Sequence, residues 1–164
     1  MRLFIPISFL LVFSFVIIYS CTKDKGRNPA LAYSNFALRD SSRNSAAFVY
    51  YKNDPNTVYP GTNGPHGTFK LKFNHKAFAQ LTDAGKLPVG SVFSDGSMIV
   101  KEILSGTTIK EYAVMYKLSG SWIWAEFTPD LKSIIHSVDS EHSVCTGCHS
   151  QPGNRDLVAT FSFH

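Results

Sequence analysis

The residues with the clearest chemical potential lie close to the C-terminus. Cys145 and Cys148 are separated by two residues, and His149 follows the second cysteine directly. This is the spacing of c-type haem attachment. In that chemistry each thiol adds across one vinyl group of the haem to form a thioether, and the next imidazole binds the iron axially. The motif therefore predicts one covalently attached haem c, with Cys145 and Cys148 as its tethers and His149 as the proximal iron ligand.

A Cys-x-x-Cys pair also occurs in zinc sites and in redox dithiols. A structural zinc site needs four ligands, and the sequence has no second cysteine pair. A thioredoxin-like dithiol needs a βαβ context, which the sequence lacks. The histidine directly after the second cysteine favours haem. A lipoprotein that acts as an interaction module without haem is the remaining alternative.

The N-terminus has the pattern of an export signal. Arg2 precedes an almost wholly apolar run from Leu3 to Tyr19, which is near the lower length limit for a membrane span. Ser20-Cys21 at its end looks like a bacterial lipobox, so residues 1–20 are predicted to be a lipoprotein signal peptide and Cys21 the lipidated residue. An uncleaved N-terminal anchor is the alternative. Both predict a membrane-anchored protein outside the cytoplasm, at the periplasmic face or the outer membrane, where c-type haem is attached in bacteria.

Composition is consistent with one exported domain. Hydrophobic residues make up 44% of the 164 residues, and 13 Phe and seven Tyr suit the wall of a haem pocket or an aromatic sheet core. The net charge is +4, and no basic block is interleaved with aromatic residues, so nucleic-acid binding is not expected. Cys21 and the haem motif account for all three cysteines, which leaves none for a structural disulfide.

The remaining pattern predicts the elements that position the motif. Residues 21–45 are expected to form a tether with one short helix over 29–38, and residues 46–164 a haem-binding domain. Strands are expected at 46–51, 68–73, 97–104, 109–118 and 122–127. With a helix over 75–84 and an apolar tail at 155–163 beside the haem, the sequence predicts an α+β, β-rich domain. Its antiparallel sheet has about five strands, accompanied by two or three short helices.

The strand over 68–73 alternates in polarity. Phe69, Leu71 and Phe73 share one face, and Lys70 and Lys72 share the other. A half-buried strand has this pattern, with its lysines in solvent.

Caps and turns follow from residue type. Asn74 is a predicted N-cap for the helix over 75–84, and Gly85 is predicted to end it. Residues 119–121 are predicted to join two strands as a hairpin. Residues 129–143 are expected to be a polar connection to the haem motif.

Two adjacent charges interrupt the strand over 97–104. Lys101 falls on the face of Ile99 and Ile103, whereas Glu102 falls on the opposite face. One of the two is expected to point inward, either as a group aimed at the cofactor or as a side chain whose charged end reaches solvent.

Several further segments, taken in order, resemble the cytochrome P-460 family, which includes the cytochromes c′-β. They span the whole mature domain and include the late Cys-x-x-Cys-His motif. The matching segments are Pro65-His66-Gly67-Thr68-Phe69, Lys86-Leu87-Pro88, residues 93–102, Met115-Tyr116-Lys117, Trp122 and Arg155-Asp156-Leu157-Val158.

The resemblance implies a β-rich domain, usually a homodimer, with one five-coordinate haem, His149 proximal and an open distal side. In hydroxylamine-oxidising members a lysine bonds covalently to the haem macrocycle, and Lys101 matches that lysine. Those members also carry a distal arginine, at whose position this chain has Phe69. That difference resembles the cytochromes c′-β, whose apolar distal pockets bind nitric oxide and similar gases.

These observations predict an exported, lipid-anchored mono-haem c-type cytochrome that binds nitric oxide or a related small nitrogen species. The alternatives are a hydroxylamine-oxidising enzyme with a Lys101–haem cross-link and a plain electron-transfer cytochrome with an unknown redox partner. An electron carrier usually has a sixth protein ligand to the iron. The candidates are Met98, Met115, His66, His75, His136, His142 and His164.

Overall fold

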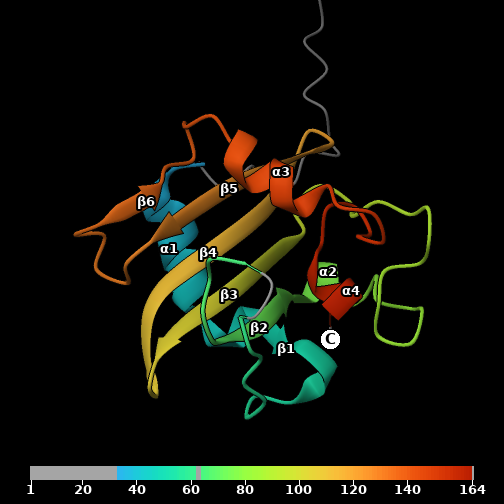
Figure 1. Ribbon diagram of the computed structural model, residues 1–164, viewed down its shortest axis with the longest axis horizontal. Helices are drawn as coiled ribbons and strands as arrows, with labels where there is room; N and C mark the ends of the chain where they lie inside the picture. The colour runs from blue at the N-terminus through green and yellow to red at the C-terminus, as the bar shows by residue number, and fades with distance from the viewer. Residues whose placement is uncertain (1–32, 62–63, 164) are drawn as a thin grey trace, which may run out of the picture.

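The computed structural model describes residues 33–61 and 64–163 and is built on a single antiparallel sheet (Figure 1). Six strands follow one another across the sheet in the order in which they occur in the chain. The strands are β1 (Phe48–Tyr50), β2 (Phe69–Asn74), β3 (Met98–Ser105), β4 (Thr108–Leu118), β5 (Ser121–Phe127) and β6 (Ile134–His136). The predicted β-rich character with an antiparallel sheet is confirmed.

The helices are short. They are α1 (Asn35–Arg43), α2 (His75–Phe78), α3 (Ser143–His149) and α4 (Thr160–Phe163), with two 3₁₀ turns at Ser45–Ala47 and Tyr51–Asn53. None of these helices, in the part of the chain that the structure describes, has the length and apolar character needed to cross a membrane.

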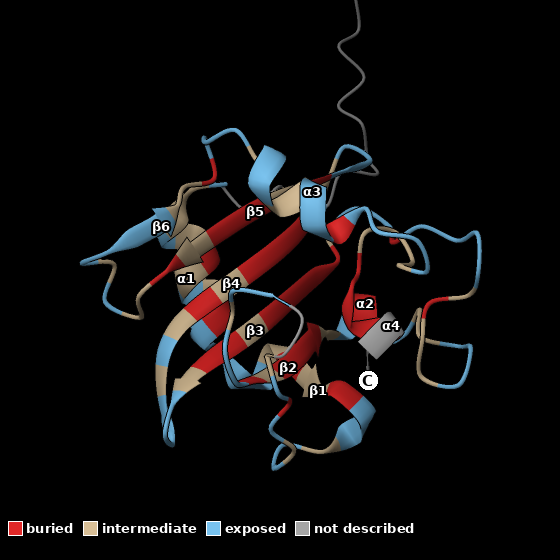
Figure 2. Ribbon diagram, viewed as in Figure 1, coloured by how far each residue is buried: buried red, intermediate tan, exposed pale blue. Residues whose placement is uncertain are grey.

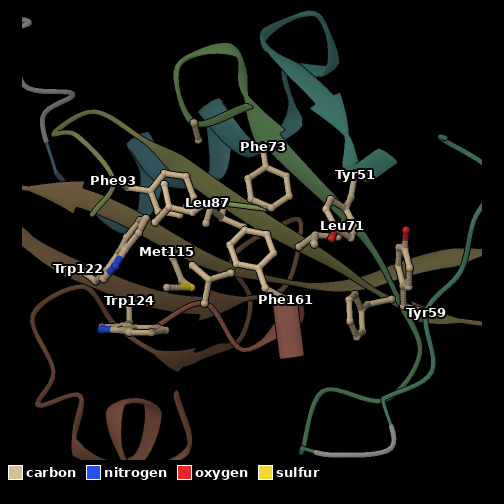
Figure 3. Close-up of a cluster of buried hydrophobic side chains, with 14 residues drawn as sticks. Tyr51, Tyr59, Leu71, Phe73, Leu87, Phe93, Met115, Trp122, Trp124 and Phe161 are labelled. Atoms are coloured by element: carbon tan, nitrogen blue, oxygen red, sulfur yellow. The ribbon is translucent and has the colours of Figure 1, made fainter. Parts of the chain in front are cut away.

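Both faces of the sheet are covered, so its central strands are buried (Figure 2). In the view of Figure 1, α1 lies behind the sheet and α3 and α4 lie in front. The rear cluster joins Leu38 of α1 to residues of β3, β4 and β5 such as Val100, Val114 and Phe127. The front cluster is rich in aromatic rings, and Phe161 lies among Phe73, Leu87 and Met115 at its centre (Figure 3). The C-terminal segment is therefore part of the core.

Local signals in the sequence explain several element boundaries. The side chain of Asn74 accepts a hydrogen bond from the backbone N–H of Ala77 at 2.9 Å, which confirms the predicted N-cap. The hairpin at 119–121 also forms, since Leu118 pairs with Ser121 across the turn. The predicted end of α2 at Gly85 is wrong, because the helix stops at Phe78. The chain instead turns back on itself through two backbone hydrogen bonds between Asp83 and Lys86.

The sheet has one strand more than the sequence indicated. Residues Ile134–His136 lie in the stretch predicted to be a polar connection, yet they pair antiparallel with β5 as β6. Because the neighbouring residues are polar, the sequence pattern did not indicate this three-residue strand. The strand forms by pairing with the edge of β5. β6 then leads the chain back across the sheet to α3.

The alternation of lysines predicted that the second face of β2 is solvated, but Lys72 on this face is buried. Lys72 is 2% exposed, because α1 and β1 cover that face. Its ammonium group forms an ion pair with Glu102 and donates to the backbone oxygen of Ser42 at 2.7 Å. Tyr50 Oη donates to the other carboxylate oxygen of Glu102 at 3.0 Å. The inward charge on this face of β3 is therefore Glu102, neutralised inside the core.

Replacing Glu102 with glutamine is expected to lower the free energy of unfolding by about 3–5 kcal/mol, because it leaves the buried Lys72 ammonium without a counter-charge. Urea unfolding followed by circular dichroism measures the change. A double Lys72→Met, Glu102→Leu variant is expected to recover most of the loss, since it removes both charges. Equal losses in the single and double variants would contradict this explanation.

Candidate functional site

A cavity of about 290 Å³ lies in front of the sheet. This is near the lower end of the roughly 300–1,000 Å³ typical of small-molecule sites. Its walls come from the loop around Pro60–Gly61, strands β2 to β6, helix α3 and the segment 158–160. Cys145, Cys148 and His149 all line it. The apolar tail thus contacts the same cavity as the predicted haem motif.

Helix α3 presents the three motif residues together. Cys145, Cys148 and His149 are three and four residues apart, so they share one side of the helix. His149 is buried, Cys145 is partly buried and Cys148 is exposed. Both thiols are free. The two thiols are therefore the more accessible part of the motif, and the histidine is the more buried part.

The ring of His149 is oriented by its neighbours. Its Nδ1 donates a hydrogen bond to the backbone oxygen of Leu157 at 2.7 Å, because a carbonyl oxygen can only accept. The Trp124 ring lies edge-on to the imidazole, with 4.6 Å between the two centroids. Burial, assisted by the charge of Lys101, lowers the pKa of His149 to about 4, so the ring is neutral at pH 7. Nε2 is then the nitrogen whose lone pair is available to a metal.

The register of the sheet sets a row of side chains across the cavity floor. Lys101 of β3 pairs with Ala113 of β4, which pairs with Glu126 of β5, which pairs with His136 of β6. All four line the cavity. The small side chain of Ala113 leaves space between Lys101 and Glu126. Residues far apart in the sequence thereby place an amine, a carboxylate and an imidazole on one surface.

Lys101 points into the cavity, so both charges at 101 and 102 are directed inward, on opposite faces of the sheet. Its Nζ lies 4.6 Å from the centre of the Phe69 ring, which is itself 4% exposed and lines the cavity. Burial lowers the pKa of Lys101 from 10.5 to about 8, against the opposing effects of Cys148 and Glu126. A substantial fraction of the side chain is therefore a neutral, nucleophilic amine near pH 8.

This pKa gives the lysine a pH-dependent effect on stability. While protonated in both states, Lys101 disfavours folding, because its charge is desolvated. We expect Lys101→Met to raise the free energy of unfolding at pH 7, and this gain to shrink as the pH rises from about 8 toward 10.5. Denaturant unfolding at several pH values across this range measures the gain. The chain with Lys101 and the Lys101→Met variant are both made in a Cys145→Ser, Cys148→Ser background, so that neither carries a tethered haem. A gain that does not vary with pH would contradict the assignment.

An acid–base pair that sequence reasoning missed also lines the cavity. His66 Nδ1 lies 3.7 Å from Glu126 Oε1, with the two side chains 19% and 13% exposed. Burial opposes ionisation of Glu126, but His66 and His136 outweigh it and hold the pKa of Glu126 below its usual value. Glu126 shares a strand face with Trp122 and Trp124. A charged residue on an aromatic face is the sequence signal that could have marked Glu126 as a site residue. No sequence signal indicated that His66 would reach it.

Backbone contact positions His66. A Cβ at Gly61 would overlap the backbone oxygen of Gly67, so a glycine is required where these two parts of the loop meet. Pro60, Gly61 and His66 all border the cavity. The loop therefore closes one end of the cavity and places the imidazole on it.

The other candidate iron ligands divide by position. Met115, His66 and His136 line the cavity. Met98 belongs to the cluster on the rear face of the sheet. His75 lies on the surface, and its Nε2 is hydrogen-bonded to the backbone oxygen of Ala46 at 3.1 Å. His142 immediately precedes α3, and His164, like Cys21, lies outside the described residues.

The donor set suits a c-type haem. It combines two free thiols beside one cavity, a neutral imidazole oriented by a carbonyl, and apolar walls from Phe69, Ile99 and others. Within the described ranges, no three His, Cys, Asp or Glu side chains converge to hold a metal ion by themselves. Cys145, Cys148 and His149 are the residues that would hold the haem.

Comparisons with protein-family models, with curated proteins and with solved structures find no match for this chain. The resemblance to cytochrome P-460 and the cytochromes c′-β therefore stays a prediction. The site is defined by its own geometry: the Cys-x-x-Cys-His motif of α3, a lysine, a carboxylate and a phenylalanine line one cavity.

Proposed function

We propose that this protein is a mono-haem c-type cytochrome, similar to the cytochromes c′-β, that binds nitric oxide or a related small nitrogen species. The observation that carries the proposal is the convergence of Cys145, Cys148 and His149 with Lys101 and Phe69 on one cavity. These residues come from α3, β3 and β2 and are separated by up to 80 positions in the chain. A bound haem would supply an iron able to coordinate a small diatomic or nitrogen-containing ligand.

The chain's own residues have distinct roles in this proposal. Cys145 and Cys148 hold the macrocycle, and His149 offers Nε2 to the iron with its proton kept on Nδ1 by Leu157. Phe69 and Ile99 contribute apolar wall and exclude water. This apolar part of the wall offers no hydrogen-bond donor and favours a neutral ligand such as nitric oxide over ligands that need polar stabilisation. Lys101 and His66 lie on the polar part of the same cavity.

A second candidate function is oxidation of hydroxylamine, and the polar side of the cavity favours it. Lys101 carries an amine whose lowered pKa leaves it partly neutral, as covalent attachment to the macrocycle requires. Glu126 Oε1 and His66 Nδ1, 3.7 Å apart on this cavity, would form a carboxylate–imidazole pair for relaying protons that the oxidation of hydroxylamine releases. An external acceptor of unknown identity would take up the electrons.

The proposed location follows from the N-terminal sequence. Export and lipidation at Cys21 would hold the domain on a membrane outside the cytoplasm, where haem c is attached. Stable attachment needs more than one acyl chain, which a bacterial lipoprotein provides. A Cys21→Ser variant is expected to lose acyl labelling and to change its membrane partition. Native material with an unmodified Cys21 would contradict lipid anchoring.

The absorption spectrum of the reduced protein, produced with a c-type maturation system, tests the proposed function. A broad five-coordinate spectrum that changes on addition of nitric oxide is the expected result. A sharp six-coordinate α-band would instead indicate an electron carrier, with Met115, His66 or His136 as the sixth ligand. A red-shifted band would indicate a haem cross-linked to Lys101. A protein without haem would contradict all three.

A further inference from the structure

The segment from Asn154 to Val158 forms hydrogen bonds with both the backbone and the side chain of His149. Asn154 Nδ2 donates to the backbone oxygen of His149 at 2.8 Å, and the backbone oxygen of Leu157 accepts from the imidazole Nδ1 at 2.7 Å. The ring and the backbone of the same residue are thus held by one short stretch of chain. The position of this stretch decides where the imidazole points.

Asp156 anchors that stretch to the sheet. Its two carboxylate oxygens accept from Lys117 Nζ of β4 at 2.9 and 3.0 Å, and the side chains of this pair are only 4% and 8% exposed. The same carboxylate accepts from the backbone N–H of Phe93 at 2.8 Å. The backbone oxygen of Asp156 accepts from Trp122 Nε1 of β5 at 2.8 Å. Four hydrogen bonds from three parts of the chain therefore converge on one residue.

Asp156 and Leu157 are the central residues of a tight turn, which the backbone N–H of Val158 closes by donating to the oxygen of Arg155 at 3.0 Å. Asp156 and Leu157 have φ angles of 47° and 64°, in the left-handed region that L-residues rarely occupy. Aspartate tolerates this region, but leucine does not favour it. The hydrogen bond of the turn and the contacts of Asp156 with the sheet together hold both residues in this region. This conformation is the one in which the carbonyl of Leu157 accepts the His149 proton.

We propose that Asp156, held by Lys117, is a positioning residue for the proximal histidine, setting its orientation and its electron donation through the carbonyl of Leu157. The inference rests on the proposed attachment of haem at Cys145 and Cys148. It adds a connection between the buried ion pair and the iron ligand that the motif does not contain.

The expected direction follows from the hydrogen bond. A firm Nδ1–H···O=C bond increases the electron donation of an imidazole to a metal, which stabilises the ferric over the ferrous state. If the carbonyl of Leu157 moves away, His149 donates less and the reduction potential rises. The Nδ1 proton also becomes accessible to water.

The test compares Asp156→Asn with the wild-type haem protein. Asparagine tolerates the left-handed region, so the substitution removes the charge without adding backbone strain. We expect a higher reduction potential by spectroelectrochemistry and faster solvent exchange of the His149 Nδ1 proton by NMR, with the haem still covalently attached. A Lys117→Met, Asp156→Asn variant leaves no uncompensated buried charge and is expected to give the same shifts if the single variant does not fold.

Glu102→Gln is the matched control, because it breaks the other buried lysine–carboxylate pair, on the rear face of the sheet. It is expected to lose stability while keeping the wild-type potential and proton exchange rate. Unchanged values in the Asp156 variants, or equal shifts in the control, would overturn the positioning role. A wild-type chain that releases its haem on a denaturing gel would overturn the proposed function, and this inference with it, before any potential is measured.

Discussion

Replacement of both Cys145 and Cys148 by serine is expected to abolish covalent haem attachment completely. The wild-type chain, produced with a c-type maturation system, is expected to keep its haem through denaturing electrophoresis, because thioether bonds survive unfolding. The double variant is expected to show no haem stain at the position of the chain, since coordination by His149 alone does not outlast unfolding. Each single variant keeps one possible thioether and is expected to retain a fainter band.

Cys21→Ser provides the control for this experiment. It removes the third cysteine of the chain, which lies outside the described residues, and is expected to leave haem staining unchanged. Intact mass before and after denaturation gives a second reading that does not depend on the stain. Free loss of haem from the denatured wild-type protein would contradict thioether attachment.

The second large effect is expected at Lys101, which separates a gas-binding protein from an oxidase. In the proposed function the lysine is not bonded to the macrocycle. Trypsin is then expected to release the haem on peptide 133–155 alone, and hydroxylamine with an artificial electron acceptor is expected to give no turnover. Nitric oxide binding is expected to persist in Lys101→Ala, because Phe69 and the other apolar walls remain.

The same digestion identifies the competing outcome. A bond between Lys101 and the macrocycle would block cleavage after that lysine and add residues 87–110 to the haem peptide. Turnover that is lost in Lys101→Ala, together with that mass, would establish the oxidase instead. Lys110→Ala is the control, since this side chain is 61% exposed near the tip of the same hairpin.

If the protein is the oxidase, Glu126→Gln is expected to lower hydroxylamine turnover by about 10²–10⁴-fold, as for loss of a positioned proton acceptor.

Local sequence patterns predicted the frame of the sheet well. Alternation of apolar and polar residues indicated β2 and β3, because side chains of a strand point to opposite faces in turn. The turn at 119–121 indicated β4 and β5 on either side of it. Asn74 and the turn at 119–121 were predicted correctly for a similar reason, since caps and hairpins depend on residues close in sequence. The motif at Cys145 to His149 is likewise local, and its helical spacing needs no tertiary information.

Predictions failed where a distant segment supplied the environment. The lysines of β2 suggested a solvated face, but α1 covers it, and Lys72 is buried against Glu102. The strand β6 exists because the edge of β5 offers it hydrogen bonds, so its own residues gave little signal. The helix α2 does not continue to Gly85, because the chain forms the Asp83–Lys86 turn instead. This turn also places Asp83 Oδ2 2.5 Å from Arg155 Nη1.

The sequence by itself determined the chemistry that this chain can offer: two thiols, an imidazole and an inward lysine at stated positions. Only the tertiary structure decided which groups face them. The pairing of Lys101, Ala113, Glu126 and His136 across four strands, and the approach of His66 through a loop, depend on sheet register and chain closure. The same holds for the Lys117–Asp156 pair behind His149. Such contacts join residues tens of positions apart, and no local pattern specifies them, because they form only when the whole sheet folds.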